Sequence, residues 1–203
     1  MTNSFSAAET GRILEAKVHL RQLFADTLQK NSPLLPAAEQ LKHFFVTGGC
    51  IASILQGESP KDYDIYSSSE SAMTQFSKYL VEFEQDFIKD VDEKYKDYIG
   101  KDGKMITANA ITLKNNMSFI TFKSGTVNEI RSSFDYVHCM PYYDILNNKL
   151  YISLTQYDAC VNKVLMVNNP DAVRTYRESK FLERGYIKMG SSIKMGSSNA
   201  KSY

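Results

Sequence analysis

Asp62 and Asp64, two residues apart, are the side chains in this sequence best suited to metal chemistry. They alternate with apolar residues up to Tyr66, which is typical of a half-buried strand. Side chains two apart on a strand point to the same face, so both carboxylates can share metal ions. Hard divalent cations such as Mg²⁺ require oxygen ligands. The spacing therefore predicts a metal site in which paired ions activate an attacking oxygen and neutralise phosphate charge.

A glycine pair, Gly48 and Gly49, precedes this predicted site. It lies between an apolar run at residues 43–47, which suits a buried strand, and a helical stretch at residues 50–55. Glycines at such a turn let the backbone approach a phosphate, and the amides at the start of the next helix favour an anion. We therefore expect Gly48, Gly49 and Cys50 to bind the phosphates of a nucleotide. The competing interpretation is that the aspartates cap a turn after Pro60; the glycine turn and the apolar run after the acids favour the metal role.

Asp135 is the candidate for a third carboxylate ligand, because apolar residues flank it in a predicted strand at residues 133–140. An ionised aspartate in a buried strand needs a metal or a charged partner. The competing interpretation is an acid on an edge strand that is paired with Arg131. His138 lies three residues further on, so a regular strand places it on the opposite face, and we expect a core or rim histidine.

Helices and strands must position these residues, and hydrophobic periodicity indicates where they lie. Helices are expected at residues 7–29, 36–42, 72–88, 155–167 and 170–184. Further strands are expected at residues 62–66, 106–113, 117–122 and 150–153, the middle two forming a hairpin. The predicted fold class is α/β (α+β), with a mixed, mostly antiparallel sheet flanked by helices. We expect a catalytic core at 1–154, a helical nucleotide-contacting extension at 155–188 and a flexible tail at 189–203, with residues 89–104 as a mobile loop.

Composition bounds the remaining possibilities. A length of 203 residues suits one domain with a small appendage. No apolar run approaches the ~20 residues of a membrane span, so we expect a soluble protein of the cytoplasm. Three cysteines at irregular spacing indicate reduced thiols. A net charge of +1 gives no global attraction to nucleic acid, so any such affinity must come from a local patch.

Two stretches of the sequence resemble a known family. Residues 48–65, GGCIASILQGESPKDYDI, resemble the head motif of bacterial-type CCA-adding enzymes and poly(A) polymerases. These enzymes belong to the nucleotidyltransferase superfamily, which has a DNA polymerase beta-like fold. Residues 171–181, DAVRTYRESKF, resemble a helical motif of the same family. Ala52 and Ser53 stand where the head motif has an Arg-Asp pair. The chain is also similar to small nucleotidyltransferase-like proteins of large tailed phages, in its FDYVH strand and its KFxxRG helix. If it is phage-encoded, the expected location is the host cytoplasm.

The resemblance implies transfer of a nucleoside monophosphate from a nucleoside triphosphate to a hydroxyl group, with release of pyrophosphate. Mg²⁺ or Mn²⁺ would be the cofactor, and the acceptor an RNA 3′ end, including that of tRNA, a protein side chain or a small molecule. The residues that it implies contact the nucleotide are Lys61, Asp171, Arg174, Arg177 and Lys180. The three basic residues of the helix also fit a solvated stripe, which is the competing interpretation.

Two alternatives to this function stay open. The first is a catalytically silent nucleotide-binding or interaction protein that keeps the fold as a scaffold. The replacement of the Arg-Asp pair favours it, whereas the three candidate carboxylates argue against it. The second is a toxin-like enzyme that modifies host tRNA or protein with the same chemistry.

Overall fold

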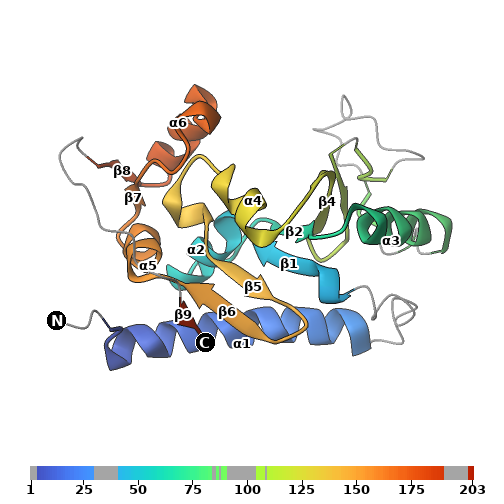
Figure 1. Cartoon of the computed structure of the whole chain (residues 1–203), viewed down its shortest axis with the longest axis horizontal. Coiled ribbons are helices and arrows are strands. Elements are labelled where there is room, and N and C mark those ends of the chain that lie inside the picture. The colour runs from blue at the N-terminus through green and yellow to red at the C-terminus, as the bar shows by residue number, and fades with distance from the viewer. Residues whose placement is uncertain are drawn as a thin grey trace.

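The computed structural model describes residues 4–29, 41–83, 86, 88–90, 104–107, 109–189 and 201–203. Within these ranges a seven-stranded sheet has the order β3-β4-β2-β1-β5-β6-β9 (Figure 1). The β2–β4 pairing is parallel, and the other pairings described in this sheet are antiparallel. The predicted mixed, mostly antiparallel sheet flanked by helices is confirmed. The strands are β1 (Phe44–Thr47), β2 (Tyr63–Ser67), β3 (Ala110–Thr112), β4 (Met117–Ser124), β5 (Tyr142–Asp144), β6 (Lys149–Ile152) and β9 (Lys201–Ser202).

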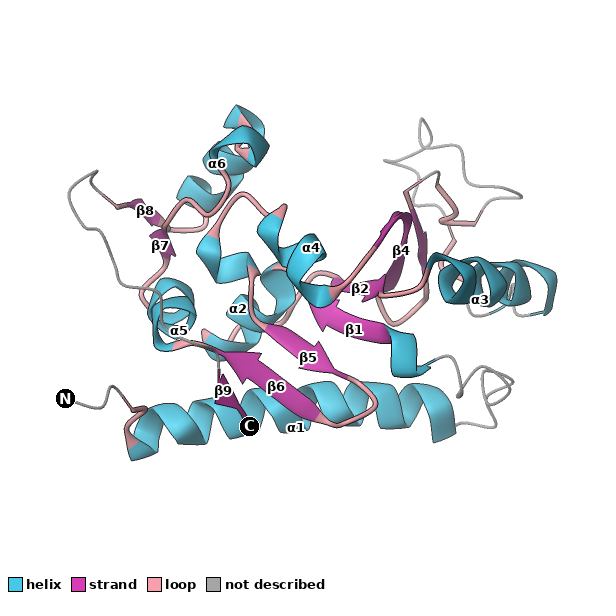
Figure 2. Ribbon diagram, in the orientation of Figure 1, coloured by secondary structure: helices cyan, strands magenta, loops and turns pink. Residues whose placement is uncertain are grey.

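One face of the sheet packs against helices α1 (Ala7–Gln29), α2 (Gly49–Leu55) and α3 (Glu70–Phe83). These helices bury their apolar residues in one core with the sheet (Figure 2). Alternation along the strands supplies the sheet's share of this core, because every second side chain points to the same face. Members of this core include Ile13, Leu20, Val46, Ile65, Phe76 and Phe119.

The opposite face carries a smaller core under α4 (Val127–Ser132). Ile130 of this helix packs with Phe45, Tyr66 and Ile120 of the sheet. Helix α4 begins with a capping box, in which Thr126 accepts from the Glu129 amide and the Glu129 carboxylate accepts from the Thr126 amide. Such reciprocal capping satisfies two amides that a helix start leaves without partners. This face also carries Asp64, because Asp64 and Tyr66 alternate with the buried Tyr63 and Ile65.

The C-terminal part contains α5 (Leu154–Val161), a single 3₁₀ turn η6 (Pro170–Ala172) and α6 (Thr175–Glu183). Strand β7 (Val164–Leu165) follows α5, and β8 (Ile187–Lys188) follows α6. The two strands pair in parallel, which places the ends of these helices side by side. A third core lies between this part and the rest of the molecule. Its members are Tyr136, Cys139, Leu165, Phe181 and Tyr186.

Three element predictions are wrong in part. Residues 133–140 form an irregular segment ending in a 3₁₀ turn, η5 (Val137–Cys139), rather than a strand of the main sheet. This segment bonds to residues 166–169 instead, since the Asp135 carbonyl accepts from the amides of Asn168 and Asn169. The helix predicted at 155–167 ends at Val161 and gives way to β7. The helix predicted at 170–184 is interrupted, because Val173 and Arg174 are extended.

Some predictions fall on residues outside the described ranges, namely most of 36–42, most of the loop at 89–104, and 190–200 of the predicted tail. Lys201 and Ser202 pair with β6 as β9. Among the helices that the structure describes, none combines the length and apolar character needed to cross a membrane.

Candidate functional site

A pocket of about 170 Å³ lies where β1 ends and α2 begins. Its walls come from the β1–α2 turn, β2, the irregular segment after α4, and α6 with the η6 turn before it. Segments far apart in the sequence therefore meet here. The lining residues are Gly48, Gly49, Asp64, Tyr66, Ser133, Phe134, Asp135, Cys139, Ala172 and Arg177.

Position 48 favours glycine for two reasons, namely its backbone conformation and the lack of space for a Cβ atom. Its φ of 96° is one that residues with a side chain rarely adopt. A Cβ atom placed on it would lie 3.0 Å from Asp64 Oδ2, closer than a carbon normally approaches an oxygen. The Gly48 amide donates to the Cys139 carbonyl at 3.0 Å, which ties the turn to the irregular segment. The glycine turn and the Asp64 carboxylate are therefore in direct contact.

Asp64 is a carboxylate with little solvent and no hydrogen-bond donor among the described residues. Burial, together with the charge of Asp62, raises its pKa to about 7, and the charges of Arg177 and Lys180 partly oppose this shift. Asp62 is exposed immediately before β2. The two carboxylates are therefore close enough to repel each other, and a cation bound between them would relieve that repulsion.

Asp135 is paired with an arginine. Its side chain is 3% exposed, and Arg177 Nε lies 2.5 Å from Oδ2 while Nη2 lies 3.3 Å from Oδ1. The partner is not Arg131, whose Nε donates to the Met140 carbonyl and whose guanidinium lies 5.0 Å from the centre of the Tyr142 ring. A charged partner for this buried acid was expected, but it comes from α6, 42 residues away.

The strand neighbours of Asp64 add no carboxylate to a metal site. The residues beside Asp64 in the sheet are Thr47 on β1 and Ser118 on β4, and neither is a carboxylate. Within the part of the chain that the structure describes, no group of three or more His, Cys, Asp or Glu side chains is arranged to hold a metal ion. The oxygens of Asp62 and Asp64 suit Mg²⁺ or Mn²⁺.

Of the remaining residues predicted to contact a nucleotide, one lines the pocket and the others lie outside its wall. Arg177 is in its wall. Lys180 is exposed, but its charge acts on Asp64. Arg174 is exposed and its Nη1 donates to the carbonyls of Asp171 and Val173, so it caps the η6 turn. The others are Asp171 and Lys61, both exposed, and Cys50, whose buried thiol has a raised pKa because of burial and the charges of Asp64 and Asp62.

Two features of this region were missed by the sequence analysis. Ser118 beside Asp64 follows from the hairpin register and the parallel β2–β4 pairing, which no local pattern reveals. Arg184 reaches back to α2, where Nη2 lies 2.9 Å from Ser53 Oγ and 3.4 Å from Glu58 Oε2. An arginine from the end of α6 thus contacts the position where the resembling motif has its Arg-Asp pair.

His138 is a core residue, as expected. It is fully buried, with its ring centre 4.5 Å from those of Phe181 and Tyr186. Neither ring nitrogen has a hydrogen-bond partner among the described residues. Burial lowers its pKa to about 3. A neutral histidine enclosed by aromatic rings is not placed for proton transfer to the pocket.

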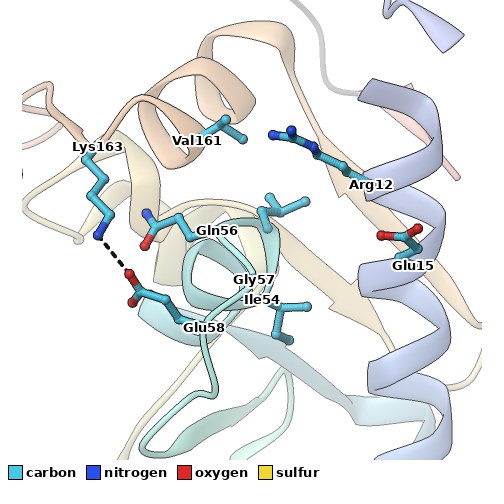
Figure 3. A pocket seen from close by; sticks show the side chains of 9 residues that line it. Arg12, Glu15, Ile54, Gln56, Gly57, Glu58, Val161 and Lys163 are labelled. Carbon is cyan, nitrogen blue, oxygen red and sulfur yellow. Dashed lines mark hydrogen bonds and ion pairs between the residues drawn. The ribbon is translucent and has the colours of Figure 1, made fainter. Parts of the chain in front are cut away.

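A larger cavity, of about 430 Å³, lies at the other end of α2, between α1 and α5 (Figure 3). Arg12 and Glu15 project towards it from α1, and Gln56 lies on its floor. Lys163 and Glu58 form an ion pair at 2.7 Å, so these two charges neutralise each other. Gly57 lines this larger cavity, but no carboxylate lies within 4 Å of the position that its Cβ atom would take. The smaller pocket at Asp64 is therefore the candidate site.

Comparison with known proteins identifies the family. The model of the Gabija anti-defense 2 family matches residues 15–163, which is more than half of the chain. The chain belongs to the Gabija anti-defense 2 family. The matched range covers β1, α2, β2 and the segment with Asp135, so the glycine turn and all three candidate carboxylates of this family member fall inside it. Among curated proteins, none matches the sequence.

Solved structures share the fold at low sequence identity. The Thermotoga maritima CCA-adding enzyme complexed with tRNA has a TM-score of 0.51 and 16% identity, over 84% of this chain and 42% of that one. A tRNA nucleotidyltransferase complexed with a primer tRNA and an incoming ATP analog has a TM-score of 0.53 and 16% identity, over 78% and 46%. This family member spans less than half the length of those proteins. The resemblance to CCA-adding enzymes therefore holds at the level of the fold.

Proposed function

We propose that this protein binds a nucleoside triphosphate with a divalent ion in the Asp64 pocket and transfers the nucleoside monophosphate to a hydroxyl acceptor, releasing pyrophosphate. The observation that carries the proposal is Asp64, a carboxylate that has no hydrogen-bond donor among the described residues and lies against the Gly48 turn. Arg177 lines the same pocket. Acidic and basic groups thus face one small space, which is the arrangement that a metal-bound phosphate needs.

Each residue in or beside the pocket has a distinct role in this proposal. Asp64 in the pocket wall and the exposed Asp62 beside it would hold Mg²⁺ or Mn²⁺, which when bound neutralises phosphate charge and activates an attacking oxygen. Gly48 and Gly49 let phosphate oxygens approach the backbone. Arg177 donates to phosphate through the guanidinium nitrogens that its carboxylate partner leaves free.

Asp135 orients Arg177 rather than binding the metal. Its two oxygens accept from Nε and Nη2, so the guanidinium plane is fixed with its remaining donors available. Lys180 adds positive charge near Asp64. Arg174, Asp171 and Lys61 lie outside the pocket wall and are proposed to contact the base or the outer phosphates. The acceptor is proposed to be an RNA 3′ end, including that of tRNA, a protein or a small molecule, modified in the course of counteracting a Gabija defence.

A second candidate function is nucleotide binding without transfer. The side chains next to Asp64 on both neighbouring strands favour it, since Thr47 and Ser118 provide neutral oxygens only. A toxin-like modification of host tRNA or protein is the same chemistry on another acceptor. Relief of growth inhibition by Asp64→Ala in cells that express the protein would identify that case.

The proposal is tested with purified protein, Mg²⁺ or Mn²⁺, each α-³²P-labelled nucleoside triphosphate, and total cellular RNA and protein as acceptors. The control variants are the Asp62→Ala, Asp64→Ala double mutant and Asp158→Ala, which removes an exposed acid from α5. Label transfer by the wild type and Asp158→Ala but not by the double mutant is the expected result. Metal-dependent binding of a fluorescent nucleotide without transfer would select the second candidate. Loss of both transfer and binding in the wild type would refute the site.

A further inference from the structure

We infer that the Asp64 pocket holds one divalent ion rather than two, and that Ser118 is the residue that sets this number. The inference rests on the proposed metal–nucleotide site. It concerns the capacity of that site, which the sequence analysis took to be two ions held by three carboxylates. The neighbours of Asp64 in the sheet carry the argument.

Sheet register defines which side chains reach the space around Asp64. Asp64 is the partner of Ser118 in the parallel β2–β4 pairing and of Thr47 in the antiparallel β1–β2 pairing. Partnered residues on adjacent strands project from the same face and lie about 5 Å apart. Thr47 and Ser118 are therefore the two strand positions from which a third carboxylate would reach an ion at Asp64.

Neither position supplies a charged ligand. Thr47 is completely buried, and its hydroxyl lies 2.8 Å from the Pro141 carbonyl and 3.2 Å from that of Cys139. Ser118 is 7% exposed, and its hydroxyl lies 3.0 Å from the hydroxyl of Thr112. Both side chains are neutral and already have partners, so they compensate none of the charge of a metal ion.

Asp135 does not take the place of the missing ligand. Both of its oxygens accept from Arg177, and its side chain is 3% exposed. Binding an ion would require that pair to separate and would leave the arginine beside a divalent cation. Within the described part of the chain, Asp62 and Asp64 are then the acids available to an ion.

The number of protein ligands limits such a site to one ion. A hard divalent ion takes about six oxygen ligands, and two ions about 4 Å apart need protein carboxylates that reach both of them. Asp62 and Asp64, together with the triphosphate, supply oxygens for one ion. The second ion, which would activate the acceptor hydroxyl, depends on a protein carboxylate that Ser118 does not provide. One ion is sufficient to retain the nucleotide, and transfer is expected to be slow.

The test counts bound ions directly. The full chain is titrated with Mn²⁺ in the presence of a non-hydrolysable nucleoside triphosphate analogue, and free Mn²⁺ is measured by electron paramagnetic resonance. One Mn²⁺ in total per protein–nucleotide complex is expected for the wild type, the same number as for the nucleotide alone, and two are expected for Ser118→Asp. Thr112→Asp places a carboxylate in the same row but one strand further from Asp64, and one ion is expected.

Each outcome has a defined meaning. Two ions in the wild type would overturn the inference and leave the proposed function intact, whereas an Mn²⁺–nucleotide complex that does not bind the protein would overturn both. One ion in a folded Ser118→Asp variant, or two in Thr112→Asp, would overturn the assignment to Ser118. If Ser118→Asp does not fold, Ser118→Glu replaces it. The ion count of the wild type tests the one-ion inference without any variant.

Discussion

Replacing the buried His138 by leucine should change how the stability of the protein depends on pH. The imidazole is fully buried between Phe181 and Tyr186, and neither nitrogen has a partner among the described residues. Burial lowers its pKa from 6.5 to about 3; the charges of Arg177 and Arg184 also lower it, and that of Asp135 opposes the shift. The folded protein therefore keeps this histidine neutral at pH values where the unfolded chain binds a proton.

The difference in pKa between the folded and unfolded states sets the sign and the size of the change in stability with pH. About one pH unit or more above 6.5, His138 is largely unprotonated in both states, so the wild type has its full stability there. As the pH falls from 6.5 towards 3, the unfolded state gains a proton that the folded state does not, and stability is lost. The loss is about 1.4 kcal/mol per pH unit, or roughly 2 kcal/mol between about pH 7.5 and about pH 5.

The assay is urea unfolding of the wild type and His138→Leu at several pH values. The two proteins share every other titratable group, so the difference between their unfolding free energies isolates His138. That difference should move by about 2 kcal/mol in favour of the leucine variant from about pH 7.5 to about pH 5. A difference that stays constant over this range would refute the reasoning, because it would mean that His138 binds a proton as readily in the folded protein as in the unfolded one.

Three further predictions concern the pocket and a helix start. Gly48→Ala should cost about 1–3 kcal/mol, because of its positive φ and the contact of the new Cβ with the carboxylate, and should weaken metal-dependent nucleotide binding at least about tenfold. Gly57→Ala, with positive φ but open space around it, should lower stability without changing nucleotide affinity. Asp135→Asn should cost about 1–3 kcal/mol, below the full effect of a buried pair because the Arg177 side chain is 38% exposed, and a double-mutant cycle with Arg177→Gln should show coupling. Thr126→Ala should cost about 1 kcal/mol in urea unfolding and leave nucleotide binding unchanged.

These predictions have clear contradicting results. Equal nucleotide affinity in Gly48→Ala and the wild type would show that the turn does not approach the phosphates. Additive effects of Asp135→Asn and Arg177→Gln would show that the ion pair contributes no net stability. A loss of nucleotide binding in Thr126→Ala would show that α4 takes part in the site.

The head of the site was predictable because it is built from neighbours in sequence. An apolar strand, a glycine turn, a short helix and a second strand occupy 44–67, and each has a local signature. The contact between Gly48 and Asp64 follows from the antiparallel β1–β2 pairing of this unit. Short-range patterns specify such a unit because periodicity and turn residues act over a few positions.

The segment that carries Asp135 was not predictable in the same way. Its apolar residues fit a strand, but its backbone bonds to 166–169 and its carboxylate to Arg177. These partners become available only when α5, β7 and α6 have packed against the core. Tertiary contacts override a strand pattern in this way, because the pattern reflects burial as much as backbone preference.

The sequence by itself determined the fold class, the glycine turn and the pair Asp62 and Asp64, since all of these depend on residue type and short spacing. Only the tertiary structure decided that Asp135 pairs with Arg177, that His138 is enclosed by aromatic rings, and that Ser118 stands beside Asp64. Strand register and the docking of α6 are set by the packing of the whole core, which no single segment encodes.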